Sequence, residues 1–358
     1  MAVQNRFKFI GDCFMPKSDS KMPFIRESES NGNKTLSVNF GVKESDNSTA
    51  FVELFGMKSD TIYTMTTDSE KFEVDWDERD EPAIVAKVAN YRKFTVDLGD
   101  ECGGNKDFVA PYDAVKHLEK WLPKFDGRLC VTGQFVIEPY NGKWYNKFKI
   151  QNVYAANPKE KNGFYIDIEL HYNKSSLDTS DMKNGKKIYL DAYLNQYMYK
   201  DKANKYVPIQ AVLDISKMDT KDEVHKRNFD YLMMFLKVKN KTMGRLGWKA
   251  KLLRGPEEAE FDESMLTDLQ RLSIELGRSK IEDYKKTVYG ENIDEIRLYD
   301  PNIRDYGEGI IDMEITFEEF ETDICTNAPK TEKLVESNND DDTDDDDDAN
   351  RDLEELFG

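Results

Sequence analysis

The chain has 358 residues, a formal net charge of −19 and 39% hydrophobic residues, with a mean hydropathy of −0.74. This composition supports buried cores in two or three domains, and the absence of an 18-residue apolar run excludes a typical membrane-spanning helix. The amino terminus has no apolar secretion signal, and the four cysteines lack CxxC spacing, so we expect a cytoplasmic chain with reduced thiols. The three histidines are isolated in sequence, so we expect no metal site and no cofactor.

Residues 1–157 have the pattern of a first, mostly β domain. Short segments with alternating or β-rich composition predict strands at 35–42, 50–57, 60–66, 83–88 and 94–98. Residues 67–112 are acidic and contain glycine, which indicates an insertion in this domain. A helix is predicted over 114–122, and Pro123 ends it.

The clearest hairpin joins residues 128–138 to residues 143–154 through a PYNG turn. Asn141 and Gly142 accept the positive φ angles of a tight hairpin turn. The second strand alternates apolar residues with lysines, and a basic strand face with interleaved aromatic rings suits a polyanion. Its candidate nucleic-acid-binding residues are Lys143, Trp144, Tyr145, Lys147 and Lys149. The alternative is an ordinary solvated strand face.

A similar unit recurs over residues 158–254. Its predicted elements are an early strand at 163–172, a hairpin of 187–200 with 205–215, and a helix at 222–237. Tyrosines recur on the hairpin face that alternation assigns to water, where they can stack on unpaired bases or pair across strands inside a packed layer. The candidate residues here are Lys187, Tyr189, Tyr193, Tyr197, Tyr199, Lys200, Lys202 and Lys205. No pattern indicates recognition of base edges, so binding should be sequence-tolerant.

A third, small helical or mixed region is predicted over residues 255–328. Met265, Leu269, Leu272 and Leu276 share one face of a helix that ends at Gly277. A capping-box pair at Ser279 and Glu282 predicts a second helix, and strand-like segments follow at 295–299 and 310–317.

Residues 329–358 form an acidic tail. The stretch 331–358 holds 13 acidic and 2 basic side chains, a net charge of −11, so the remaining 330 residues carry −8. Mutual repulsion of the aspartates prevents a packed core, and the tail is predicted to be disordered. Its apolar tip suggests a contact for partner proteins, with the candidate residues Asp352, Leu353, Glu354, Glu355, Leu356 and Phe357.

These features resemble a known family. The segment RLCVTGQFVIEPYNGKWYNKFKIQNVY is similar to the late-strand hairpin of single-stranded-DNA-binding proteins, whose barrels are oligonucleotide-binding (OB) folds. The tail ending in DLEELFG resembles the acidic tails of those proteins in bacteria and tailed bacteriophages, although this tip contains no proline. The resemblance implies a mainly β fold with α+β additions: two OB-fold-like β-barrel units, a small helical or mixed region and a disordered acidic tail.

The resemblance also implies a function. We expect a non-enzymatic protein that binds and protects single-stranded DNA during phage DNA replication, recombination or repair, in the host cytoplasm. The tail is expected to recruit replication proteins (polymerase, helicase or primase) and to compete with DNA for the lysine-lined groove. No membrane partner is expected, and the sequence leaves the oligomeric state open.

Two other functions fit parts of the sequence. An acidic-tailed chaperone or assembly factor for basic proteins agrees with the charge of −8 outside the tail. A metal-dependent nuclease would use carboxylates on neighbouring strands, namely Asp167, Glu169 and Asp191. The chain has no P-loop, GxSxG, HExxH or CxxC motif, so we expect no enzymatic activity.

Competition between tail and DNA makes a testable prediction. Deletion of residues 331–358 should tighten the binding of single-stranded DNA, chiefly at low salt, because it removes an internal polyanion. Binding isotherms of the full and the shortened chain at two salt concentrations measure the effect. Unchanged or weaker binding by the shortened chain would contradict the competition.

Overall fold

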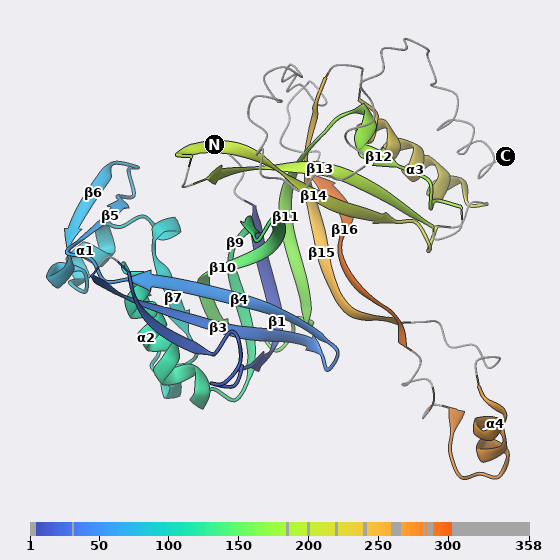
Figure 1. The fold of residues 1–358 in the computed structure, drawn as a ribbon, viewed down its shortest axis with the longest axis horizontal. Coiled ribbons are helices and arrows are strands. Elements are labelled where there is room, and N and C mark those ends of the chain that lie inside the picture. The colour runs from blue at the N-terminus through green and yellow to red at the C-terminus, as the bar shows by residue number, and fades with distance from the viewer. Residues whose placement is uncertain are drawn as a thin grey trace.

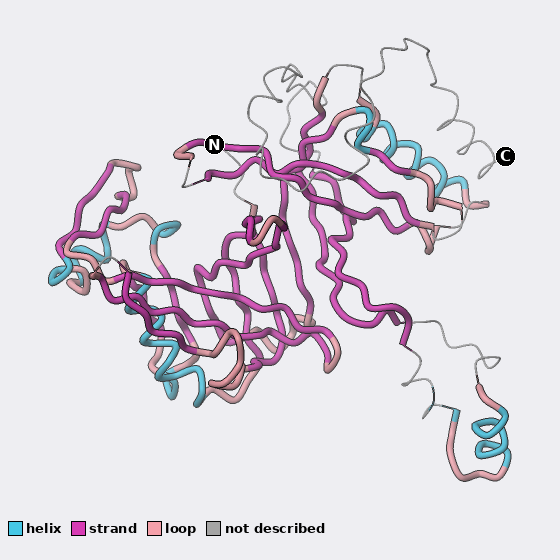
Figure 2. Tube along the Cα trace, viewed as in Figure 1, coloured by secondary structure: helices cyan, strands magenta, loops and turns pink. Residues whose placement is uncertain are grey.

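The computed structural model describes residues 5–30, 32–183, 186–198, 201–218, 221–238, 242–258, 266–281, 284 and 289–302. These residues form a mainly β structure in which strands far outweigh helices (Figures 1 and 2). One network of 14 strands contains nearly all of the β structure, and a separate two-stranded sheet lies beside it. The prediction of a mainly β fold with small helical additions is confirmed.

The first barrel is a closed ring of five strands: β1 (Arg6–Phe14), β3 (Asn33–Ser45), β4 (Ser48–Met57), β9 (Arg128–Tyr140) and β10 (Lys143–Ala155). β1 pairs antiparallel with both β3 and β9, while β3 pairs with β4 and β9 with β10. The ring closes where β4 and β10 run parallel, at Glu53 and Lys149. This strand order is that of the five-stranded Greek-key barrel of the OB fold.

Apolar alternation determines which side of each strand faces the barrel interior. Phe9, Phe40, Phe135 and Phe148 are buried there, and the rings of Phe9 and Phe148 lie with their centroids 4.6 Å apart. Helix α2 (Pro111–Trp121) packs against β3 and β4 and covers one end of this core. The predicted helix is therefore confirmed, with Pro111 in its first turn.

The insertion between β4 and α2 is more elaborate than its sequence suggested. Its strands are β5 (Thr61–Met65), β6 (Lys71–Asp75), β7 (Phe94–Asp97) and β8 (Asn105–Phe108), and its helical turns are η1 (Trp76–Glu78), α1 (Pro82–Lys87), η2 (Asn90–Arg92) and η3 (Asp100–Cys102). The predicted strand at 83–88 is wrong, because this segment forms α1. Pro82 favours the first turn of a helix, and the amides of Ile84 and Val85 bond to the Glu81 carbonyl.

A second barrel repeats the strand order of the first. Its strands are β11 (Gly163–Tyr172), β13 (Lys187–Met198), β14 (Ala203–Asp214), β15 (Gly244–Glu258) and β16 (Tyr289–Asn302). β11 pairs with β13 and β15, β13 with β14, and β15 with β16. Parallel pairing of β14 with β16 closes the ring, and α3 (Glu223–Leu236) lies between β14 and β15 in the chain. The prediction of two OB-fold-like barrels is thereby confirmed.

The strand pairing of the second barrel changes the predicted division of the chain at residues 254 and 255. β15 crosses this point without interruption, and β16 hydrogen-bonds to β15 and β14. The described strands of the predicted region 255–328 therefore belong to the second barrel. Helix α4 (Asp268–Glu275) lies at the far end of the β15–β16 arm, away from both barrels (Figure 1). Residues 303–358, including the acidic tail, lie outside the described residues.

Short elements complete the fold. They are β2 (Ile25–Ser30), which pairs with β3, η4 (Leu122–Lys124), η5 (Lys174–Ser176) and β12 (Leu177–Asp178).

The three described cysteines are free, as predicted, and burial raises the pKa of the Cys13 thiol to about 12. None of the described helices is long and apolar enough to cross a membrane.

The two barrels are joined through their first strands. β1 pairs antiparallel with β11, with Lys8 opposite Tyr165. A second connection is the side chain of Gln196 in β13, which accepts from the Ile137 amide at 2.9 Å and donates to the Ile137 carbonyl at 2.6 Å. The Gln196 side chain thus satisfies the backbone groups of Ile137, which lies in β9 beyond the residues that pair with β1.

The pairing of β9 with β10 in the first barrel depends on a close approach at Gly133. A Cβ atom on this residue would lie 1.9 Å from the Lys149 carbonyl oxygen on the neighbouring strand. Gly133→Ala should therefore force β9 and β10 apart and destabilise the protein by about 2–4 kcal/mol, in the range of severe packing changes. Thermal unfolding measures this loss, with Gln134→Ala, at the exposed next position, as control. An unchanged melting temperature for Gly133→Ala would contradict the strand register.

Candidate nucleic-acid interface

The outer surface of β4 carries exposed aromatic side chains. Ala50, Val52 and Leu54 point into the barrel, so the alternating positions point outward. Phe51 is 42% exposed and Phe55 is 60% exposed on this outer surface. Two exposed phenylalanines on the outward side of one strand, separated only by Glu53, are unusual, because burial of such rings is normally favourable.

Phe14, at the end of β1, extends the same surface across β3. Its ring lies 6.2 Å from that of Phe51 in an edge-to-face arrangement, and the Lys43 Nζ lies 5.2 Å from its centre. Gly41 makes room for Phe14, because a Cβ atom there would come within 3.1 Å of the Phe14 ring. We call the surface formed by Phe14, Lys43, Phe51, Phe55 and Met57 the aromatic face.

Apart from Phe14 at the end of the first strand, the aromatic face lies on the second and third strands of an OB-order barrel. On this surface such barrels bind oligonucleotides and oligosaccharides. Each exposed ring can stack on an unpaired base, and such stacking tolerates any sequence. The sequence interpretation missed these residues because it assigned AFVELFGM only as a strand. The same period-two alternation would have placed Phe51 and Phe55 outside, since Val52 and Leu54 are inside.

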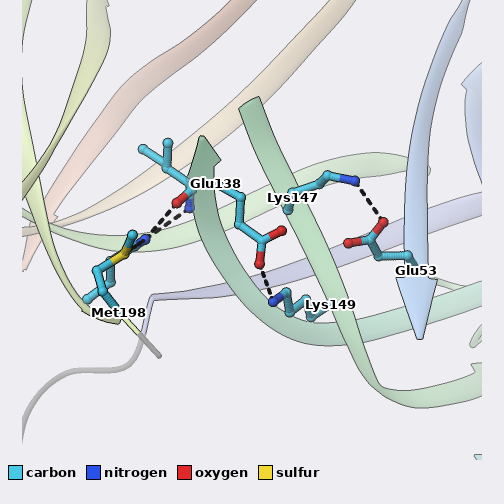
Figure 3. Close-up of polar contacts among 7 residues, drawn as sticks. Glu53, Glu138, Lys147, Lys149 and Met198 are labelled. Atoms are coloured by element: carbon cyan, nitrogen blue, oxygen red, sulfur yellow. Dashed lines mark hydrogen bonds and ion pairs between the residues drawn. The ribbon is translucent and has the colours of Figure 1, made fainter. Parts of the chain in front are cut away.

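Strand β10 borders the aromatic face and carries all five predicted residues of the first hairpin. Lys147 bonds to Glu53 of β4 at 2.8 Å, and Lys149 bonds to Glu138 of β9 (Figure 3). The structure thus places both lysines on the outer surface, as predicted, but each has a carboxylate partner that the sequence did not indicate.

The remaining predicted residues of this hairpin divide between surface and core. Lys143 and Tyr145 are exposed near the turn, and the Tyr145 ring lies 6.2 Å from that of Tyr140. Trp144 is partly buried against the hydrophobic core, and its Nε1 is buried with no hydrogen-bond partner among the described residues. Successive side chains of a strand point to opposite sides, and the neighbours Lys143 and Tyr145 are exposed. Trp144 therefore lies on the core side of β10 and not on the outer surface.

The tyrosine stripe predicted on β13 is not a continuous open platform. Tyr193 is 7% exposed, between His171 of β11 and Pro208 of β14 in the strand register. Burial, followed by the Asp191 carboxylate, raises the pKa of the Tyr193 hydroxyl. Tyr189 is partly buried, and Tyr197 near the hairpin turn is 50% exposed. In the closed barrel, β11 lies beside the hairpin, and this third strand explains the burial of Tyr193. The alternation of residues in the two hairpin strands alone could not predict it.

The predicted lysines of the second hairpin also separate. Lys187 forms an ion pair with Glu295 of β16 at 2.8 Å, and both side chains are largely buried, so this lysine links two strands. Lys202 is exposed in the turn and Lys205 is partly exposed. Tyr199 and Lys200 lie outside the described residues, as do all of the predicted partner-binding residues of the tail.

Of the three carboxylates of the nuclease alternative, Asp167 is exposed, whereas Glu169 and Asp191 have protein partners. Glu169 is buried and lies 2.6 Å from the Arg245 Nε, and Asp191 accepts a hydrogen bond from Gln210. His171 beside Glu169 is also buried, and burial followed by the Arg245 charge lowers its pKa to about 4. Within the described residues, no group of three or more His, Cys, Asp or Glu side chains could hold a metal ion.

Comparisons with known proteins give little further information. No protein-family model matches the chain, and no curated protein matches it. Among solved structures, it is similar to a deletion mutant of the single-stranded DNA binding protein from Thermus aquaticus, with 10% identity and a TM-score of 0.28. The match covers 72% of this chain and 97% of that one. A similarity at this level does not establish a shared family.

The different environments of two β13 tyrosines can be tested directly. Tyr193→Ala should destabilise the protein by about 3 kcal/mol, because it removes a buried ring from a packed layer. Tyr197→Ala removes a half-exposed ring and should change the melting temperature far less. Thermal unfolding of both variants checks this, and equal losses would contradict the assigned burial.

Proposed function

We propose that this chain is a non-enzymatic protein that binds single-stranded DNA with little dependence on sequence. The observation that carries the proposal is the set of exposed rings of Phe14, Phe51 and Phe55 on the outer surface of an OB-order barrel. Stacking platforms next to lysines are the usual means by which proteins bind unpaired strands.

In this proposal the strand lies along the aromatic face and continues beside β10. Phe51 and Phe55 stack on bases, while Lys43, Lys147 and Lys149 lie at its margins, within reach of phosphates. Tyr145 and Lys143 extend the path toward the hairpin turn. In the second barrel, Tyr197, Lys202 and Lys205 are the described candidates that retain exposure.

The proposed role is protection of unpaired DNA during replication, recombination or repair, in the cytoplasm of a host cell if the chain is of phage origin. The acidic tail would then recruit a polymerase, helicase or primase through its apolar tip. Its aspartates would compete with DNA for the basic positions of the barrels. Charge opposition between tail and lysines supports this part of the proposal.

A chaperone for basic proteins is the second candidate, favoured by the net charge of −8 outside the tail. The two functions differ in their response to oligo-dT. A DNA-binding protein should show salt-sensitive binding with quenching of tyrosine or tryptophan fluorescence, and a chaperone should show neither.

Substitution of the exposed rings tests the proposed function. Phe51→Ala with Phe55→Ala should weaken oligo-dT binding at least tenfold, because base stacking on one ring is worth about 1–3 kcal/mol. The melting temperature should hardly change, since both rings are exposed. Tyr63→Ala, which removes the exposed tyrosine of β5, outside the barrel strands, is the matched control. Unweakened binding by the double variant would reject the aromatic face as the site.

A further inference from the structure

The two lysines of β10 nearest the aromatic face are each bound to a carboxylate from a neighbouring strand. We infer that Glu53 and Glu138 are specificity-determining residues, which make this surface select unpaired strands and reject duplex. The inference rests on the proposed function, because it concerns how the same surface distinguishes its ligands.

Glu53 occupies the centre of the aromatic face. It lies on β4 between the outward-pointing Phe51 and Phe55, and its register partners are Asn39 on β3 and Lys149 on β10. Its Oε2 accepts from the Lys147 Nζ at 2.8 Å. A carboxylate here lies where a strand stacked on the two rings must pass.

Glu138 holds the second lysine from the opposite side of β10. The Lys149 Nζ donates to its Oε1, so the two lysines point to carboxylates on the two strands that flank β10 (Figure 3). The four side chains of these pairs are between 25% and 41% exposed. Both pairs are therefore within reach of a ligand, and neither is a buried structural ion pair.

These pairs change the electrostatics of the surface. A free lysine attracts phosphate and releases counterions when a strand binds, whereas a lysine paired with glutamate has no net charge to contribute. Phosphate must also displace the carboxylate. Exposed pairs of this kind are weak, so displacement is feasible, but the net gain from phosphate contacts is small.

The consequence differs for the two forms of DNA. A duplex keeps its bases paired and stacked inside, so it can approach the barrel only through its phosphates. An unpaired strand offers its bases to Phe51 and Phe55 as well. A duplex also carries about one charge for every 1.7 Å of its axis, so a free lysine gains more from a duplex than from an unpaired strand. Pairing of the lysines therefore weakens duplex binding more than it weakens the binding of an unpaired strand.

Removal of the two carboxylates tests the inference. Glu53→Gln, Glu138→Gln and the double variant retain the shape of the side chains and free the lysines. Glu73→Gln is the matched control, because Glu73 is an exposed carboxylate on β6, outside the barrel strands. Dissociation constants are measured by fluorescence anisotropy for an oligo-dT and for a duplex of equal length, at two salt concentrations.

We expect the double variant to bind duplex at least tenfold tighter and oligo-dT only about threefold tighter, which reduces the discrimination. The dependence of log K on log salt for oligo-dT should steepen by up to about 0.7 for each freed lysine. The control should leave both affinities unchanged. Thermal unfolding verifies folding, and Glu138→Gln alone, near the hairpin turn, serves if Glu53→Gln unfolds the barrel.

The outcomes separate the two levels of the proposal. If oligo-dT binding depends on Phe51 and Phe55 but the glutamine variants discriminate like the control, the specificity role of Glu53 and Glu138 is wrong and the proposed function stands. If neither the wild-type chain nor any variant binds oligo-dT, the proposed function fails and this inference fails with it.

Discussion

The closure of each barrel is the constraint on which the rest of the structure depends. In both, the third and fifth strands meet in parallel, Glu53 beside Lys149 in the first barrel and Val212 beside Arg297 in the second. Once the ring is closed, every second side chain must enter a finite interior, and its neighbours must face outward. The exposure of Phe51 and Phe55 follows from this, because Val52 and Leu54 occupy the core.

The same strand order produces two different outer surfaces. The first barrel exposes phenylalanines on its third strand, whereas the second buries Tyr193 and Tyr206 on the corresponding hairpin. His171 of β11 contributes to this difference, since its ring lies 5.0 Å from that of Tyr206. An aromatic stripe on a strand is therefore not by itself a binding platform, and the neighbouring strands determine whether a ligand can reach it.

Charge also has to be considered locally. The acidic composition of the chain outside its tail would argue against a nucleic-acid partner if the net charge alone decided it. Beside the aromatic face, however, two lysines of β10 form ion pairs with Glu53 of β4 and Glu138 of β9. A surface that is nearly neutral and rich in exposed rings favours the uncharged part of a ligand, which for a nucleic acid is the unpaired base.

The sequence by itself determined the mainly β class, the two long hairpins and helix α2, because alternation, Asn141-Gly142 and Pro123 act over a few residues. It did not distinguish the six-residue helix α1 from a strand, since one short apolar segment suits both. Only the tertiary structure decided that β16 completes the second barrel, that Tyr193 is buried, and that Lys147 and Lys149 are paired with Glu53 and Glu138. Each of these depends on strands distant in sequence, and strand-to-strand register is set by ring closure and not by local pattern.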